Sequence, residues 1–366
     1  MSLAPVVALG LVIGGALGAL GGGGSILAVP VRANLASSPP ARRPERGRLG
    51  TAGHQQADEQ RGPGPQRGGT MRIALVSTAA CALLDDDLPP LVDALADGGA
   101  EAVVADWHDD GFDWSAVDLA VIRSTWDYTW QVDEFLAWAD RVGRTTRLAN
   151  PAPVVRWNTD KRYLLDLAAA GVPTVATSVL APGDGPAALG GIAPGREIVV
   201  KPVVSAGARD TERYPPGGLA AAHAHVERLH GEGRAVMVQP YLPDVDERGE
   251  TGLVFVGGVF SHAFRKGPIL TPGASFVDGV YREEDISGRT ASPAELDVAI
   301  AALDAVAASV PGHSGHDLPY ARVDVAPDGA RHVVLELELV EPSLYLATDP
   351  AAAGRAATAF SRAAAA

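Results

Sequence analysis

The sequence predicts an α/β protein in which a parallel sheet precedes parts that combine helices with antiparallel hairpins. Two patterns support this fold class. Over residues 72–142, short apolar segments alternate with amphipathic ones, which is typical of parallel strands connected by helices. After Asn150-Pro151, helical segments are combined with strands and two long hairpin patterns. Apolar residues make up 47% of the 366 residues, which is enough for a complete core.

The first seventy residues are expected to lie outside this fold because their composition differs from the rest. Residues 1–31 carry no charged side chain, and residues 33–70 are rich in Ser, Pro, Arg, Gly and Gln, a composition typical of a disordered linker. The net charge is +4 over residues 1–70 and −18 over residues 71–366. The change in charge therefore coincides with the change in composition.

The apolar stretch over residues 1–31 has two interpretations. It is long enough to span a bilayer, and it resembles the first membrane segment of sulfite-exporter-like permeases. One helix cannot form a permease, however, and a strand pattern begins directly after Met71. We therefore expect a start-site or gene-fusion artefact, with a working protein that begins at Met71. A genuine membrane anchor is the alternative.

The segment 71–152 is expected to form an N-terminal α/β domain. Its apolar runs are short and buried in character, and the segments between them have apolar residues at helical spacing. The expected strands are 72–77, 101–107 and 117–124, and the expected helices are 88–98 and 133–142.

Residues 153–240 and 241–366 are expected to form two further α+β parts. Gly171 is well placed to end a helix, because glycine adopts the left-handed conformation of a helix C-cap. The expected helices are 161–171, 219–233, 294–310 and the C-terminal tail, and the expected strands are 195–203 and 235–242. Two hairpins are expected over 251–268 and 320–342, turning at Gly257-Gly258 and at Pro327-Asp328-Gly329.

Charge and cysteine content exclude several functional classes. The chain has 44 Asp and Glu against 30 Lys and Arg, and an acidic chain without clustered cations is poorly suited to binding nucleic acid. Cys81 is the one cysteine, which excludes a disulfide framework and Cys-built zinc or iron–sulfur sites. It also fits a reducing compartment, so we expect a cytoplasmic location unless residues 1–31 form an anchor.

Lysine is rare in this chain and its positions are informative. Only Lys161, Lys201 and Lys266 occur, against 27 arginines. A compact ammonium that lies between phosphate oxygens cannot be replaced by a planar guanidinium without rearrangement. Lys201 ends a buried strand pattern directly before Pro202, and Lys161 follows Asp160 at a helix start. The three lysines therefore indicate phosphate binding, with random drift as the alternative.

Acidic side chains gather on the last hairpin. Glu336 and Glu338 are two residues apart on a strand and so share one face, and Asp324 on the partner strand can lie beside them. Three convergent carboxylates without a local cation would repel one another, and Mg²⁺ would relieve this repulsion. The alternative is a solvated strand face. No GxxxxGK[ST] and no strand–GxGxxG–helix pattern occurs, which excludes P-loop NTPases and dinucleotide dehydrogenases by motif.

Five motifs in order resemble the ATP-grasp superfamily, in its glutathione-synthetase-like branch. They are NP…WNTDKRYLLDLAAAGVPTVAT, IVVKP with SAG, MVQPYL, RGETGLVFVGGVFSHAFRKGP and RVDV…LELELVEP, and the resemblance covers residues 72–362. RSTWDY (123–128) and GVFSHAFRK further resemble the cyclo-ligases that form D-cycloserine from O-ureido-D-serine. The resemblance implies a three-part architecture: an N-terminal parallel α/β domain and two α+β subdomains that clamp ATP. It also implies a small, amino-acid-like substrate and allows a homodimer.

The resemblance further implies roles for individual residues in binding the nucleotide. The expected phosphate ligands are Lys161, Lys201 and a closing loop at 205–208 that includes Ser205, Ala206 and Gly207. The expected adenine and ribose contacts are the Gln239 side chain, the backbone of Tyr241 and Leu242, and Glu250.

Charge neutralisation and metal binding are implied in the same way. Lys266 and Arg282 would neutralise the transferred phosphoryl group. Asp324, Glu336 and Glu338 would hold one or two Mg²⁺ ions, for which Mn²⁺ is a substitute. The superfamily usually has Glu-x-Asn where this chain has Glu-x-Glu, so the number of metal ions stays open.

Arg123 is a candidate carboxylate clamp, because it ends a strand of the N-terminal domain where ligands of open α/β sheets bind. The alternative is a surface arginine in a salt bridge. Trp126 and Tyr128 fit either packing or a substrate wall, and Asp127 could pair with an amine. His262 is either a proton carrier or a hydrogen-bonded structural residue.

The function expected from these residues is an ATP-dependent carboxylate–amine ligase. ATP would activate a substrate carboxylate as an acyl phosphate, which a nitrogen nucleophile then attacks. In a cyclo-ligase of the D-cycloserine type, that nitrogen belongs to the same molecule. The alternatives are an intermolecular amino-acid or peptide ligase, and a non-catalytic ATP-binding module tethered through residues 1–31.

Overall fold

The computed structural model describes residues 69–184, 189, 191–192, 194–270 and 284–366. They belong to one compact unit, Gln66–Ala366. The expectations for residues 1–31 and for the linker up to residue 68 lie outside the described residues. Among the residues that are described, no helix is long and apolar enough to cross a membrane.

The N-terminal part is a four-stranded parallel sheet with the order β2-β1-β3-β4. All three expected strands are present, and the edge strand β4 was not expected. The strands are β1 (Arg72–Ser77), β2 (Glu101–Asp106), β3 (Leu119–Ser124) and β4 (Arg147–Ala149). The helices are α1 (Leu88–Asp97), α2 (Val132–Thr145) and, from the C-terminal end of the chain, α8 (Ala352–Ala365).

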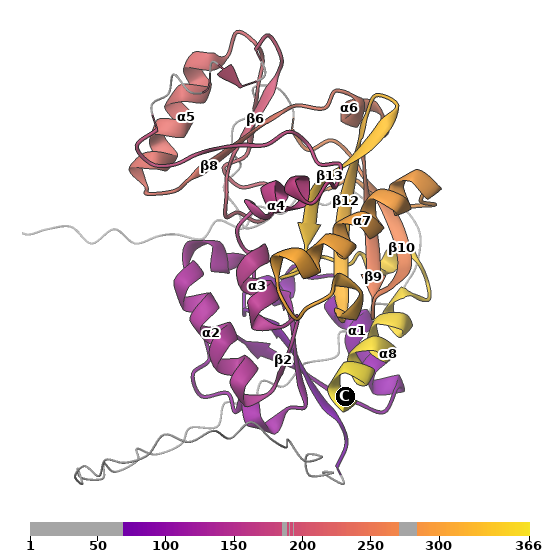
Figure 1. Cartoon of the computed structure of the whole chain (residues 1–366). Coiled ribbons are helices and arrows are strands. Elements are labelled where there is room, and N and C mark those ends of the chain that lie inside the picture. The colour runs from indigo at the N-terminus through magenta and orange to yellow at the C-terminus, as the bar shows by residue number, and fades with distance from the viewer. Residues whose placement is uncertain (1–68, 185–188, 190, 193, 271–283) are drawn as a thin grey trace, which may run out of the picture. The chain divides into compact units, whose positions relative to one another are not determined.

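Helices cover both faces of the parallel sheet, which explains why β1 and β3 are continuous apolar runs rather than alternating ones. Ile73 and Leu75 of β1 point to the face where α1 and α8 lie side by side, and pack in one cluster with Phe360 (Figure 1). Ala74 and Val76 point to the opposite face, toward the helix α2. The last helix of the chain thus packs on the first sheet.

A second sheet, antiparallel, has the order β5-β8-β6-β7 and is covered by one helix, α5 (Leu219–Gly231) (Figure 1). The strands 195–203 and 235–242 were expected from the sequence; the two short edge strands were not. The strands are β5 (Ser178–Leu180), β6 (Ile198–Pro202), β7 (Glu212–Tyr214) and β8 (Val236–Pro240). The segment between β6 and β7 contains the expected small-residue loop.

The third sheet has the order β11-β10-β9-β12-β13 and contains both expected hairpins. The long helix α7 (Pro293–Ser309) packs on it and begins with a capping box formed by Ser292 and Glu295. The strands are β9 (Glu250–Val256), β10 (Val259–Lys266), β11 (Ile286–Arg289), β12 (Tyr320–Asp328) and β13 (Arg331–Glu338).

The turns of the two hairpins agree with expectation to different degrees. The first turns at Gly257 and Gly258, both with positive φ, as expected. The expected turn at Pro327-Asp328-Gly329 is partly wrong, because Pro327 and Asp328 still pair with His332 and Arg331. Gly329, at φ +63°, begins the turn instead. The hairpin is therefore longer than the turn signal suggested.

Three short helices connect the sheets: α3 (Ala152–Asn158), α4 (Tyr163–Ala169) and α6 (Asp244–Arg248). The expected helix 161–171 is shorter than predicted, and Gly171 has the positive φ expected at its end. Asn158 at the end of α3 hydrogen-bonds the edge of β13, donating to Leu337 O at 2.8 Å and accepting from Leu339 N at 2.7 Å. These bonds satisfy backbone groups at a buried sheet edge and fix Lys161 close to β13.

Candidate active site

One pocket brings together most of the residues singled out in the sequence. Its walls come from the second and third sheets, from the segment after β13, and from Trp126 and Tyr128 after β3. The predicted residues that line it are Lys161, Lys201, Ser205, Ala206, Gly207, Gln239, Tyr241, Leu242, Glu250, Lys266, Glu336 and Glu338. Asp324 is fully buried beside them. Arg282 lies outside the described residues.

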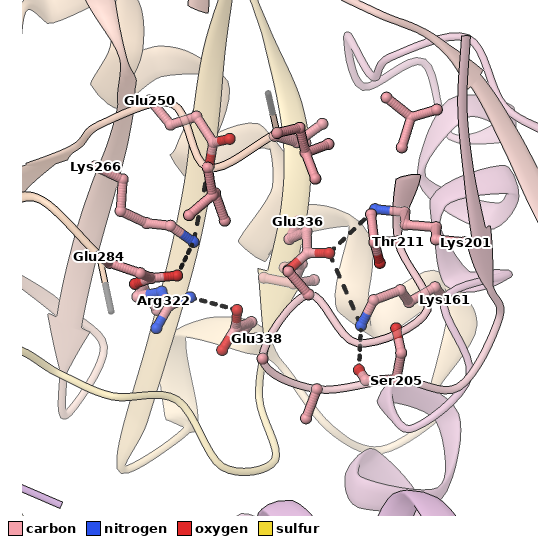
Figure 2. A pocket seen from close by; sticks show the side chains of 18 of the residues that line it. Lys161, Lys201, Ser205, Thr211, Glu250, Lys266, Glu284, Arg322, Glu336 and Glu338 are labelled. Atoms are coloured by element: carbon pink, nitrogen blue, oxygen red, sulfur yellow. Dashed lines mark hydrogen bonds and ion pairs between the residues drawn. The ribbon is translucent and has the colours of Figure 1, made fainter. Parts of the chain in front are cut away.

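Two lysines from different elements meet at one carboxylate. Lys201 Nζ, at the end of buried β6, lies 3.1 Å from Glu336 Oε1, and Lys161 Nζ lies 3.8 Å from the same oxygen. Figure 2 shows both ammonium groups pointing at Glu336, with Lys161 also donating to Ser205 O at 2.9 Å. The two rare lysines therefore form one cationic end of the pocket.

The loop after β6 has an unusual backbone. Gly207, Ala208 and Asp210 all have positive φ, which turns the chain sharply over the pocket. Arg209 places its guanidinium 3.7 Å from the centre of the Trp130 ring, which is a cation–π contact. This contact holds the loop against the segment that follows β3.

The three predicted metal ligands converge. Asp324 pairs in register with Glu336, and one carboxylate oxygen from each of Asp324, Glu336 and Glu338 lies within 4.8 Å of the others. Oxygen donors at this spacing, partly buried and negatively charged, fit a divalent cation such as Mg²⁺. A fully solvated strand face is excluded, since Asp324 is buried.

The expectation that these carboxylates lack local cations is wrong. Arg322, two residues before Asp324, donates to both oxygens of Asp324 at 2.8 Å and also bonds Glu338. Lys266 lies 3.5 Å from Asp324. Cations and carboxylates therefore alternate on this hairpin. Arg322 was missed in the sequence, although strand periodicity places it on the same face as Asp324.

The electrostatics of the two hairpin glutamates differ. Burial acts to raise the pKa of Glu336, but Lys161, Lys201 and Lys266 outweigh it and hold that pKa well below its usual range. Burial raises the pKa of Glu338 to about 8, with Arg322 opposing this effect. Glu336 is therefore the firmly ionised member of the pair.

Lys266 is the centre of a second charge cluster. Its Nζ lies 3.4 Å from Glu284 and 3.8 Å from Glu250 (Figure 2). It also lies 3.5 Å from Asp324. Burial acts to lower its pKa, but the three acids outweigh burial and keep the ammonium charged. Burial also raises the pKa of Glu250 to about 7 against the attraction of Lys266. Glu284 was not found from the sequence, because no local pattern connects it to Lys266.

The expected adenine contacts line the pocket, with one restriction. The Tyr241 N–H already donates to Glu197 O at 2.9 Å, so of its backbone groups only the carbonyl is available to a base. The Gln239 side-chain amide donates to Thr177 Oγ1 at 2.9 Å. The Tyr241 ring lies 3.4 Å beneath the Arg213 guanidinium, which fixes this segment at the strand end.

The expectations for Arg123 and Asp127 change with the structure. Arg123 is buried, does not line the pocket and lies 3.4 Å from Asp87, so neither a direct clamp nor a surface salt bridge describes it. Asp127 is bonded to Trp107 and His108 rather than facing the pocket.

His262 is the structural residue of the two alternatives. It is buried, and its ring nitrogens contact Ser261 Oγ and Leu344 O at 2.9 and 2.8 Å. It is also absent from the pocket lining.

The three sheets, the lysine pair and the carboxylate hairpin are those of an ATP-grasp ligase. Solved structures with this fold include the RimK domain ATP-grasp protein from Sphaerobacter thermophilus, at 21% identity and a TM-score of 0.55. That match covers 78% of this chain and 98% of the other. D-Alanine–D-alanine ligase from Bacillus anthracis has a TM-score of 0.58 at 14% identity, covering 81% and 97%.

The chain belongs, within this class, to the D-cycloserine synthetase (DcsG) family. Residues 73–150 match the family model of the DcsG N-terminal domain. The cycloserine biosynthesis protein DcsG of Streptomyces lavendulae is 44% identical over 283 residues, which are 75% of this chain and 92% of that protein. The crystal structure of D-cycloserine synthetase DcsG has a TM-score of 0.72 at 40% identity and covers 80% of this chain and 99% of the other.

This membership makes the chain an ATP-dependent carboxylate–amine ligase that uses a divalent metal and acts on a small molecule. An intermolecular ligase and D-cycloserine synthetase share this chemistry of carboxylate activation.

Proposed function

We propose that this protein closes the ring of D-cycloserine from O-ureido-D-serine at the expense of ATP, with Mg²⁺ as its metal. The observation that carries the proposal is the convergence of Lys161, Lys201 and the carboxylate hairpin on one pocket, in a chain 44% identical to a cycloserine biosynthesis protein. The non-catalytic module is disfavoured because the charged residues needed for phosphoryl transfer are all present.

The metal would be held by Asp324, Glu336 and Glu338, whose oxygens already converge. A bound Mg²⁺ would neutralise the phosphate oxygens and align them for transfer. Lys161 and Lys201 would exchange part of their contact with Glu336 for the phosphates. Small residues in the loop at 205–207 allow its backbone to approach those phosphates closely.

The nucleotide base would lie between the second and third sheets. Adenine would contact the Gln239 side chain, the Tyr241 carbonyl and the Leu242 backbone. The Glu250 carboxylate would accept hydrogen bonds from the ribose hydroxyls. These residues are at the ends of β8 and β9, where backbone groups of the connecting segment face the pocket.

The substrate carboxylate would attack the γ-phosphorus, so that an oxygen–phosphorus bond forms and the bond to ADP breaks. Lys266 and Arg322, held by buried acids, would neutralise the charge on the transferred group. Arg282 remains a proposed partner in this step. Fixed cations suit the role because they need no reorganisation during the reaction.

Ring closure would follow within the same molecule. The ureido nitrogen next to oxygen attacks the acyl carbon, a carbon–nitrogen bond forms, and the carbon–oxygen bond to phosphate breaks. That nitrogen loses its proton as inorganic phosphate leaves. Because the ring nitrogen of D-cycloserine carries no carbamoyl group, that group must leave by hydrolysis as carbon dioxide and ammonia.

The remaining expectations stay proposals. They are the three-part division into residues 71–152, 153–240 and 241–366, a cytoplasmic location, a homodimer, and the use of Mn²⁺ in place of Mg²⁺.

The test is phosphate release by the full chain with ATP, Mg²⁺ and O-ureido-D-serine, with the product mass measured in the same reaction. We expect one phosphate, one ammonia and one D-cycloserine for each ATP consumed, and about a thousandfold less release by Lys201→Ala. Release only with other acids and an added amine would replace the cyclo-ligase with an intermolecular ligase. ATP binding without release on any acid would support the non-catalytic module.

A further inference from the structure

We propose that Glu341, facing the pocket beside Tyr128, binds the α-ammonium group of the substrate. This inference deepens the proposed function and rests on an amino-acid-like substrate. It concerns the amino group of such a substrate, which the phosphate-binding lysines would repel.

The pocket carboxylates differ in their partners. Glu250, Glu284, Glu336 and Glu338 each lie within 4.0 Å of a lysine or arginine nitrogen. Glu341 has no such ion pair within the described part of the chain, although it lines the same pocket. A negative charge left without a cation at a pocket wall fits a cationic group that arrives with the ligand.

The surroundings of Glu341 suit a small ammonium. Tyr128 and Trp126 line the same pocket, and the Trp126 indole donates to the backbone carbonyl of Glu341 at 3.4 Å. This bond holds Glu341 beside the segment that follows β3 without neutralising its carboxylate. Burial raises the pKa of Glu341 to about 7, with Lys161 and Tyr128 opposing.

The position of Glu341 also suits the geometry of an α-amino acid. The α-ammonium is attached to the carbon next to the carboxylate that is activated, so its partner must lie close to the phosphoryl-transfer end. Glu341 follows Glu338 by three residues, and the field of Lys161 reaches its carboxylate. The amine partner is thus Glu341 rather than Asp127, which is bonded to Trp107 and His108.

The test compares O-ureido-D-serine with 3-(ureidooxy)propanoic acid, which has the same skeleton without the amino group. For Glu341→Gln we expect kcat/KM for the amino substrate to fall by about a hundredfold, and for the analogue by less than about threefold. The KM for ATP should not change. The matched control is Glu284→Gln, whose carboxylate is paired with Lys266, and which should affect both substrates alike.

Two outcomes would overturn the inference: equal losses on both substrates in Glu341→Gln, or loss of discrimination in Glu284→Gln instead. Thermal unfolding separates a binding role from a structural one. Without substrate, Glu341→Gln should unfold at the same or a higher temperature than the wild type, because it removes an unpaired charge. A clear decrease would indicate a structural carboxylate.

Failure of the proposed substrate is distinguishable from failure of this inference. If the wild type does not convert O-ureido-D-serine, the same comparison is made with the amino acid that does release phosphate and its deaminated counterpart. If no acid releases phosphate, calorimetric binding of O-ureido-D-serine and its deaminated analogue in the presence of ATP and Mg²⁺ replaces turnover. Absence of any preference for the ammonium in the wild type would reject a role for Glu341.

Discussion

Lys201 and Glu336 are 135 residues apart in the chain, and their side chains lie 3.1 Å apart at the wall of the pocket. One ends a buried strand of the second sheet and the other is on the last strand of the third. The pair connects the two sheets at the place where phosphates are proposed to bind. Their attraction keeps the site charged and assembled before the substrates arrive.

Replacement of Lys201 by Ala should reduce phosphate release by about a thousandfold, because it removes a positioned cation from the phosphates. Lys201→Arg is the matched control and should restore little of the phosphate release, since a planar guanidinium does not fit where a compact ammonium lies. Steady-state kinetics and ATP binding by calorimetry check this. Near-normal ATP affinity in Lys201→Ala would contradict the assigned role.

Glu338→Asn should keep activity within about tenfold, whereas Glu336→Gln should abolish it. Asparagine supplies an oxygen ligand and recreates the Glu-x-Asn pattern of the superfamily, while Glu336 carries the firmly ionised carboxylate between two lysines. Magnesium titrations at saturating ATP measure both variants. Equal losses in the two would show that both carboxylates are needed in ionised form.

Stability without ligands should fall as the pH rises from about 4.5 to about 7, in part because of Glu341. Its pKa is raised from 4.5 to about 7 in the folded protein, so the folded state binds more protons than the unfolded chain in this window. Glu341→Gln should remove about 3 kcal/mol of this pH dependence. Urea unfolding at several pH values gives the difference between the two proteins, and parallel curves would argue against the raised pKa.

Trp130→Ala should loosen the loop that follows β6, because it removes the ring that Arg209 covers at 3.7 Å. We expect a three- to tenfold increase in the KM for ATP, with little change in stability, since Trp130 is 59% exposed. Limited proteolysis at the loop reports the same change. Trp130→Phe, which keeps an aromatic face, should lie between the wild type and Trp130→Ala.

Asn158→Ala should destabilise the protein by about 2–3 kcal/mol, because it leaves backbone groups of Leu337 and Leu339 unsatisfied in a buried position. The same change should reduce activity through misplacement of Lys161, which follows three residues later. Asn158→Asp keeps the oxygen that accepts from Leu339 N–H and loses only the bond to Leu337 O. It should therefore reduce the free energy of unfolding by less than Asn158→Ala does. Urea unfolding followed by activity measurements separates the two effects.

Much of the fold could be predicted because its signals are local. Continuous apolar runs marked β1 and β3, and paired glycines marked the β9–β10 turn. The strands missed were β4, β5, β7 and β11, which have three or four residues each and are too short to show a period. The short helices α3 and α6 were also missed. The turn prediction at Pro327 and Asp328 was wrong because both residues still pair across the hairpin, with His332 and Arg331.

The sequence by itself determined which chemical groups are available, such as the three lysines and the ordered motifs. It also determined which groups share a strand face, because Glu336 and Glu338 are two residues apart. Only the tertiary structure decided their partners. It placed Arg322 and Lys266 against Asp324, brought Glu284 to Lys266, and moved Arg123 away from the pocket toward Asp87. Periodicity describes neighbours within one element. These pairings join segments from different elements, whose separation depends on strand register and on how the sheets pack.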